Sequence, residues 1–211
     1  MKAYWFSRED GTTDNQPIPA VVGGMAQELA VSPTPWNASK LASGDVLWEV
    51  ETKTRVKDIG STKVSCKYLR KVNLARECCQ FAAQQALLVI DDWDAPDIAR
   101  QYFEDEAKGI DRSDIRDEVH KIANLARIKS TQEQLSFVAA IAAANAAGPL
   151  GCLAPASCIC SVMLVEACRE DGAIRPDPLS IAQTHAYEAA ELVAITAFDA
   201  MALDALYSSE Q

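Results

Sequence analysis

The sequence lacks the short motifs by which many catalytic sites are recognised. It contains no Gly-x-Ser-x-Gly turn, no phosphate-binding glycine loop, no dinucleotide fingerprint and no His-Glu-x-x-His pair. Histidine occurs only twice, at His120 and His185, and we expect both on helix surfaces, with His120 on a charged, solvated face. These absences favour a protein that has neither a catalytic site nor a cofactor.

Long apolar runs are missing as well. The start, Met-Lys-Ala-Tyr-Trp-Phe, has no apolar core of the kind found in secretory signals. Residues 134–165 carry no charge, but Gly148, Pro149, Gly151 and Pro155 divide them into pieces shorter than the roughly 20 residues that a membrane span needs. We therefore expect two close-packed, buried helices in this stretch and no membrane insertion.

Positive charge is scarce in the second part of the chain. The formal net charge is −10, with ten basic and eight acidic residues up to position 75 and ten basic and 22 acidic residues after it. Binding to phosphates or to anionic lipid requires basic residues along a face. We therefore predict no direct nucleic-acid binding and no membrane partner.

Cysteine occurs seven times, without a Cys-x-x-Cys pair. An odd number without a signal segment predicts reduced thiols and a cytoplasmic location, in a bacterium or an infected host cell. Four of these residues, Cys152, Cys158, Cys160 and Cys168, could in principle hold a metal, but their spacing is unlike that of zinc motifs. We interpret them as small core residues.

Two strands are predicted in the first part of the chain. Residues 46–52 and 63–72 alternate between apolar and polar side chains, and the connection between them contains Asp58 and Gly60. An antiparallel hairpin is the simplest arrangement of these strands. We assign residues 1–73 to a small β-rich part.

Helical periodicity begins after Asn73 and continues to about Tyr207. Asn73 is suited to cap the first helix, and Asp94, followed by Pro96 in the first turn, to cap the second. The pattern predicts a bundle of five or six Ala-rich helices over residues 74–211. The fold class is therefore α+β, with a small antiparallel β part followed by a mainly helical bundle.

Part of the sequence resembles an uncharacterised family found in phage and bacterial genomes. Its members have a small β-rich head, a helix that ends in Trp-Asp-Ala-Pro and an Ala-rich helical tail. The resemblance covers residues 1–106 and includes the Trp93–Pro96 tetrad and the segments 29–33, 41–51, 63–67 and 83–97. Residues 27–30 read Gln-Glu-Leu-Ala where the family has Gly-x-His-Ala, so no activity that depends on that histidine is expected. The resemblance implies a phage or mobile-element context and names no reaction.

The function predicted first is protein–protein interaction without catalysis. Trp93, Tyr102 and Phe103 lie in an acidic helical region and are the residues we expect to contact a partner from the host or the phage. A narrower hypothesis is an inhibitor of a host defence complex that offers its carboxylates to a nucleic-acid groove.

The alternative is an enzyme of unknown class with its site on the β-rich head. Glu49 and Glu51 share one face of the predicted strand, about 7 Å apart, a separation that suits an acid and a base. Tyr4, Trp5 and Arg8 would complete the wall of this site.

A homodimer is the predicted assembly. Residues 135–163 offer long apolar faces that a small bundle buries only in part. Pairing of two copies through the helical half would cover these faces and leave the β-rich head free for a partner.

Overall fold

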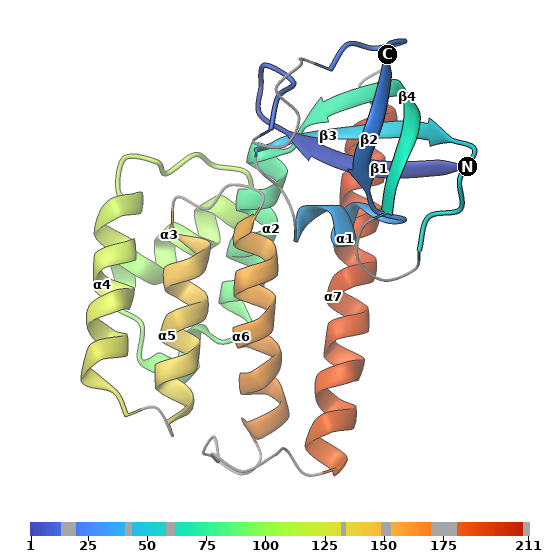
Figure 1. Ribbon diagram of the computed structural model, residues 1–211. Coiled ribbons are helices and arrows are strands. Elements are labelled where there is room, and N and C mark those ends of the chain that lie inside the picture. The colour runs from blue at the N-terminus through green and yellow to red at the C-terminus, as the bar shows by residue number, and fades with distance from the viewer. Residues whose placement is uncertain are drawn as a thin grey trace. The chain divides into compact units, whose positions relative to one another are not determined.

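The structure is a computed structural model that describes residues 1–13, 20–40, 44–57, 62–131, 134–148, 153–169 and 181–208 (Figure 1). It is 58% helical and 20% strand, which confirms the predicted α+β class. The chain forms two compact units. Unit 1 comprises 1–77, 151–153 and 196–211, and unit 2 comprises 78–150 and 154–195.

Unit 1 is built on a four-stranded antiparallel sheet. Its strands are β1 (Lys2–Ser7), β2 (Met25–Val31), β3 (Val46–Thr52) and β4 (Thr62–Asn73), in the spatial order β1-β3-β4-β2. The predicted hairpin is confirmed as β3 and β4. Beyond the end of β2, Ser32 exchanges two backbone hydrogen bonds with Tyr4, so the two outer strands approach each other at this point.

One face of the sheet forms an apolar core. The rings of Trp5, Trp48 and Tyr68 pack with centroids 5.1–6.3 Å apart. The indole Nε1 of Trp48 donates a 2.9 Å hydrogen bond to the hydroxyl of Ser7, so this buried donor is satisfied.

The last part of α7 (Ile181–Ser208) belongs to unit 1 and packs against a short helix, α1 (Pro35–Ser39). The rings of Trp36 and Phe198 meet edge to face at 5.4 Å. Thr34, which directly precedes α1, caps this helix. From α7, the carboxylate of Asp199 accepts a 2.7 Å hydrogen bond from the Trp36 backbone N–H. The C-terminal end of the chain is thus an integral part of unit 1.

Unit 2 contains the rest of the helices. These are α2 (Ala75–Leu87), which begins in unit 1, the 3₁₀ turn η1 (Ile90–Trp93), α3 (Asp97–Ala107), α4 (Arg116–Lys129), α5 (Leu135–Ala146), α6 (Ala154–Cys168) and the first part of α7. The Asn73 side chain accepts a 2.9 Å hydrogen bond from the Ala75 N–H, as predicted for a cap. Asp94 does not cap α3. It ends η1 in the left-handed conformation, and Pro96 precedes α3.

The Ala-rich stretch is internal to unit 2. α5 lies between α4 and α6 (Figure 1) and buries small side chains on several sides, which allows helix axes to approach closely. Seven of its twelve residues are buried: Val138, Ala139, Ala140, Ala142, Ala143, Ala144 and Ala146. These faces are therefore not open to the predicted dimer contact, because neighbouring helices cover them. None of the helices in the described ranges is long and apolar enough to cross a membrane.

Candidate functional site

The three aromatic residues predicted to contact a partner lie in the core of unit 2. Trp93, Tyr102 and Phe103 are 5%, 1% and 0% exposed, and the last two rings pack edge to face at 5.0 Å. The Arg116 guanidinium donates hydrogen bonds to the Tyr102 hydroxyl at 3.4 Å and to Cys79 Sγ at 2.8 Å. The prediction that these three side chains form a contact surface is wrong, because they pack inward and give this unit its core.

A buried carboxylate, Glu49, organises a polar cluster in unit 1. Its side chain is fully buried, and its Oε1 lies 2.7 Å from Nζ of Lys2 and accepts a 2.6 Å hydrogen bond from the Tyr207 hydroxyl. On the other side, Nε of Arg70 lies 3.0 Å from Oε2. Two cations and a phenol therefore offset the large cost of burying this charge.

Lys2, Tyr4 and Arg70 extend this cluster. Lys2 Nζ also donates a 2.8 Å hydrogen bond to the Tyr207 hydroxyl, and Lys2 and Arg70 both lie over the Tyr207 ring. The hydrogen bond with Glu49, followed by that with Tyr207, raises the pKa of Lys2. Tyr4 pairs with Glu49 across the strands, and burial raises the pKa of its phenol to about 12, so it is neutral at neutral pH.

Only part of the predicted enzyme site comes together. The register of β1 and β3 places Tyr4 opposite Glu49, but Glu51 is exposed and pairs across the sheet with Lys67. Arg8 is exposed beyond the end of β1, and Trp5 faces the opposite side of the sheet, in the apolar core. Glu49 is held in ion pairs while Glu51 is solvated, so this geometry gives no support to an acid–base pair of carboxylates.

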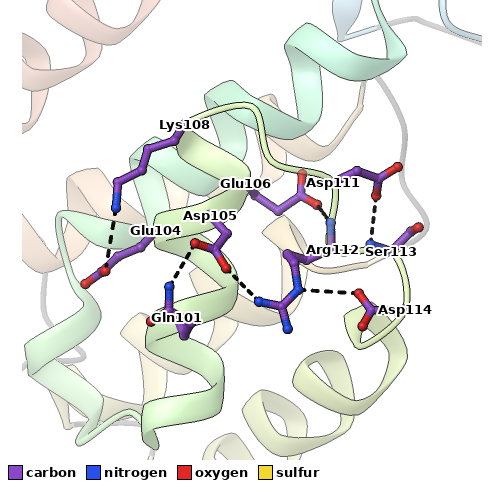
Figure 2. A network of polar contacts seen from close by, with 9 residues as sticks. All are labelled: Gln101, Glu104, Asp105, Glu106, Lys108, Asp111, Arg112, Ser113 and Asp114. Carbon is purple, nitrogen blue, oxygen red and sulfur yellow. Dashed lines mark hydrogen bonds and ion pairs between the residues drawn. The ribbon is translucent and has the colours of Figure 1, made fainter.

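The most acidic region of the chain is residues 91–118, with eleven acidic and four basic residues and a net charge of −7. Figure 2 shows its second half, where Arg112 lies between Asp105 at 2.6 Å and Asp114 at 3.4 Å. The buried Glu106 carboxylate accepts a 2.7 Å hydrogen bond from the Arg112 backbone N–H. Arg112 thus stabilises the connection between α3 and α4.

A surface that the sequence reading missed lies at the start of β2. Val21, Val22 and Met25 are 65%, 55% and 69% exposed. The turn from Val21 to Gly24 is closed by a 2.8 Å hydrogen bond, and Gly23 has φ +83°, a conformation that glycine adopts without strain.

Lys67 of β4 borders these apolar side chains, because it pairs with Met25. On its other side Lys67 pairs with the exposed Glu51 of β3, and Lys63 lies four residues away along β4, opposite Ala30; both lysines are exposed. Two backbone hydrogen bonds of 2.8 and 3.0 Å tie the turn to Tyr68, next to Lys67 in β4. We call the group formed by Val21, Val22, Met25, Lys63 and Lys67 the cationic-apolar surface.

The sequence held one signal for this surface. Residues 53–71 contain seven basic residues and one acidic residue, in a chain that is acidic as a whole. The net charge of residues 1–75 did not reveal this basic cluster, because most acidic residues of that part lie before residue 53. The sequence did not indicate that Val21 and Val22 are exposed, because valine is also common in buried strands.

The histidines and cysteines have structural surroundings. His120 is half-buried, not solvated: its Nδ1 lies 2.8 Å from the Ala144 carbonyl oxygen near the end of α5, and its Nε2 lies 3.0 Å from the Asn124 side-chain amide. The imidazole therefore joins α4 to α5, whereas His185 is exposed on α7.

Of the four clustered cysteines, Cys158 and Cys168 are buried and Cys160 is exposed, while Cys152 lies outside the described residues. Burial raises the pKa of the Cys158 thiol. Within the part of the chain that the structure describes, no three His, Cys, Asp or Glu side chains are grouped so that they could hold a metal ion.

No protein-family model matches the chain, and no curated protein or solved structure compared with it matches either. Its function is therefore inferred from its own residues.

Proposed function

We propose that the chain is a non-enzymatic binding protein that acts by contact with another protein, through the cationic-apolar surface of unit 1. The observation that carries this proposal is the exposure of Val21, Val22 and Met25 beside Lys67, with Lys63 further along the same strand. Exposed apolar side chains that lie together, with a charged rim, are typical of interaction sites.

The chemistry of the other candidates supports this choice. The negative charge of Glu49 is balanced by ion pairs with Lys2 and Arg70, and its Oε1 accepts a hydrogen bond from Tyr207. A general acid or base needs access to a substrate, and a fully buried, ion-paired carboxylate lacks that access. The polar cluster around Glu49 is better explained as a set of contacts that holds the end of α7 on the sheet.

The partner that fits this surface carries acidic side chains around an apolar centre, because complementary charge directs association and like charge suppresses it. In the phage setting that the family resemblance implies, the partner is a host or phage protein. The narrower version, an inhibitor of a host defence complex, uses a different surface: the carboxylates of residues 91–118 would enter the basic nucleic-acid groove of that complex. Competition by the purified chain for the DNA bound by a defence complex tests that narrower version.

Affinity capture from host lysate with matched variants tests the proposal. Val22→Asp with Met25→Asp should abolish recovery of a stoichiometric partner. Ile128→Asp on α4 should not, although Ile128 is 72% exposed and equally apolar. Equal recovery by all three forms, or no partner with the wild-type chain, would contradict the proposal.

A further inference from the structure

The end of the β3–β4 hairpin carries a concentration of positive charge. Lys53, Arg55 and Lys57 follow β3, Lys63 is the second residue of β4, and all four side chains are exposed. Residues 53–63 contain these four basic residues and one acidic residue, Asp58, which lies outside the described residues. The whole chain has a formal net charge of −10. We call Lys53, Arg55, Lys57 and Lys63 the hairpin-end cluster.

The backbone that bears this cluster is held in place at both ends. The Thr52 hydroxyl donates a 3.1 Å hydrogen bond to the Ser65 carbonyl, and the Lys57 N–H donates a 3.0 Å hydrogen bond to the Thr62 hydroxyl. Between these contacts Val56 is 3% exposed and packs into the apolar core of unit 1. The basic side chains are therefore presented to solvent from a fixed segment.

The charge of the hairpin-end cluster is not balanced by ion pairs. No acidic side chain in the described part of the chain forms an ion pair with any of its four members. Glu51, the exposed carboxylate that precedes the cluster in β3, lies across the sheet from Lys2 on one side and Lys67 on the other. Like charges that are close together repel, so the cluster lowers the stability of the free protein. A partner that brings carboxylates to it would relieve this repulsion.

An acidic segment of a protein fits this cluster better than a phosphate backbone does. The cluster shares unit 1 with the exposed apolar side chains of Val21, Val22 and Met25. Lys63 lies four residues along β4 from Lys67, the partner of Met25 in the sheet. At the rise of a strand this separation is about 13 Å, which one extended segment can span. A phosphate backbone offers no apolar side chain to these residues, and the 22 acidic residues after position 75, against ten basic ones, repel any extended anionic surface.

We propose that the hairpin-end cluster binds an acidic segment of the partner protein, next to the part of that partner that covers Val21, Val22 and Met25. This inference rests on the proposed function, and it names the chemistry of the partner. The partner carries an apolar group followed, after about four residues of extended chain, by several Asp or Glu side chains. Basic clusters recognise acidic motifs of this kind through charge-assisted hydrogen bonds.

A synthetic peptide tests this chemistry with the full chain. The peptide has a fluorescent label, two leucines, a short polar spacer and about eight glutamates, long enough to span the distance along β4. The first variant carries Lys57→Glu and Lys63→Glu. The control carries Lys121→Glu and Lys129→Glu, which change two exposed lysines of α4 by the same total charge. The comparison therefore separates the position of the charge from the net charge of the protein.

Fluorescence anisotropy in low salt measures the binding of the peptide, with circular dichroism to show that each variant is folded. The Lys57→Glu, Lys63→Glu variant should bind about tenfold or more weakly, and the control should stay within about twofold of the wild-type chain. At 1 M salt, where the Debye length is about 3 Å, wild-type binding should weaken as well. Lys57→Gln with Lys63→Gln removes the charges without reversing them and should also weaken binding, which keeps the test valid if the reversal unfolds the chain.

Equal weakening by the control, or no binding by the wild-type chain, would overturn the inference. So would tighter binding of single-stranded DNA of the same net charge, or of phosphatidylcholine vesicles with about 30% phosphatidylserine, because the occupant would then be a nucleic acid or a membrane. If the peptide does not bind while capture of a partner still depends on Val22 and Met25, the inference fails and the proposed function stands. If capture is indifferent to Val22→Asp with Met25→Asp, the proposed function fails whatever the peptide does.

Discussion

The phenol of Tyr207 donates a 2.6 Å hydrogen bond to the buried carboxylate of Glu49, which lies 158 residues earlier in the chain. This bond joins the end of the last helix to a strand of the sheet in unit 1. The ion pairs of Glu49 with Lys2 and Arg70 surround the same atoms. The C-terminal segment is therefore required to complete the polar environment of Glu49.

Replacement of Tyr207 by Phe should lower the free energy of unfolding of unit 1 by about 1–2 kcal/mol. The buried Glu49 carboxylate loses one hydrogen bond, and the loss is moderate because Tyr207 itself is partly exposed. The ring that lies beneath Lys2 and Arg70 is kept. Tyr68→Phe is the matched control, since the Tyr68 hydroxyl is buried without a hydrogen-bond partner among the described residues. Urea unfolding should show no loss for the control, and an equal loss for both variants would contradict the role of the Glu49 contact.

Asp199→Asn should stabilise unit 1 at neutral pH. Burial raises the pKa of the Asp199 carboxyl, against smaller opposing effects of hydrogen bonds with Trp36 and Thr34. The pKa of this carboxyl is therefore higher in the folded than in the unfolded state. Its protonated form favours the folded state, so its contribution to stability is full below the unfolded pKa and is lost as pH rises through the folded pKa. The ionised carboxylate therefore costs stability at neutral pH, whereas asparagine keeps an oxygen acceptor for the Trp36 N–H.

Unfolding measured from neutral to acidic pH checks this sign. The advantage of Asp199→Asn should shrink as pH falls and be absent below roughly pH 4, where aspartic acid is protonated in both states. A variant that is less stable than the wild-type chain at neutral pH would show that the charge itself is needed at this position.

Sequence patterns predicted the elements that depend on local periodicity. The β3–β4 hairpin follows from the alternation in residues 46–52 and 63–72, and the contact of Asn73 with the Ala75 N–H follows from a local cap rule. Glu49 fits the same alternation as Glu51, so the sequence could not distinguish them. Their difference arises from Tyr207, which only tertiary packing brings to the sheet.

The candidate site was harder to predict for a similar reason. Tyr102 and Phe103 lie on an amphipathic helix with many acids, a pattern that fits an interface and a core equally well. Burial against other helices of unit 2 decides between them. The exposure of Val21 and Val22 likewise depends on the turn at Gly23, which the composition of that loop indicates without showing which side chains face solvent.

Among the six described cysteines, Cys160 should react first with an alkylating reagent in the folded protein. It is the exposed one, whereas Cys66, Cys78, Cys158 and Cys168 are buried. Burial raises the pKa of Cys66 to about 11 and also raises that of Cys158, which suppresses their reactive thiolate forms. Peptide mapping after a short exposure to iodoacetamide should find Cys160 labelled well before these. Denaturant should remove the difference, and equal labelling of Cys158 in the native state would contradict its burial.

The proposed function requires that the cationic-apolar surface contacts another protein, and site-specific photo-crosslinking in cells that produce the chain tests this contact. A crosslinking amino acid is placed at position 22 in one sample and at position 128 in another, since both native side chains are apolar and exposed. We expect a discrete adduct from position 22, which disappears when Lys63 and Lys67 are changed to Glu, and no discrete adduct from position 128. A chain without an adduct at position 22, or with the same adduct from both positions, would contradict it.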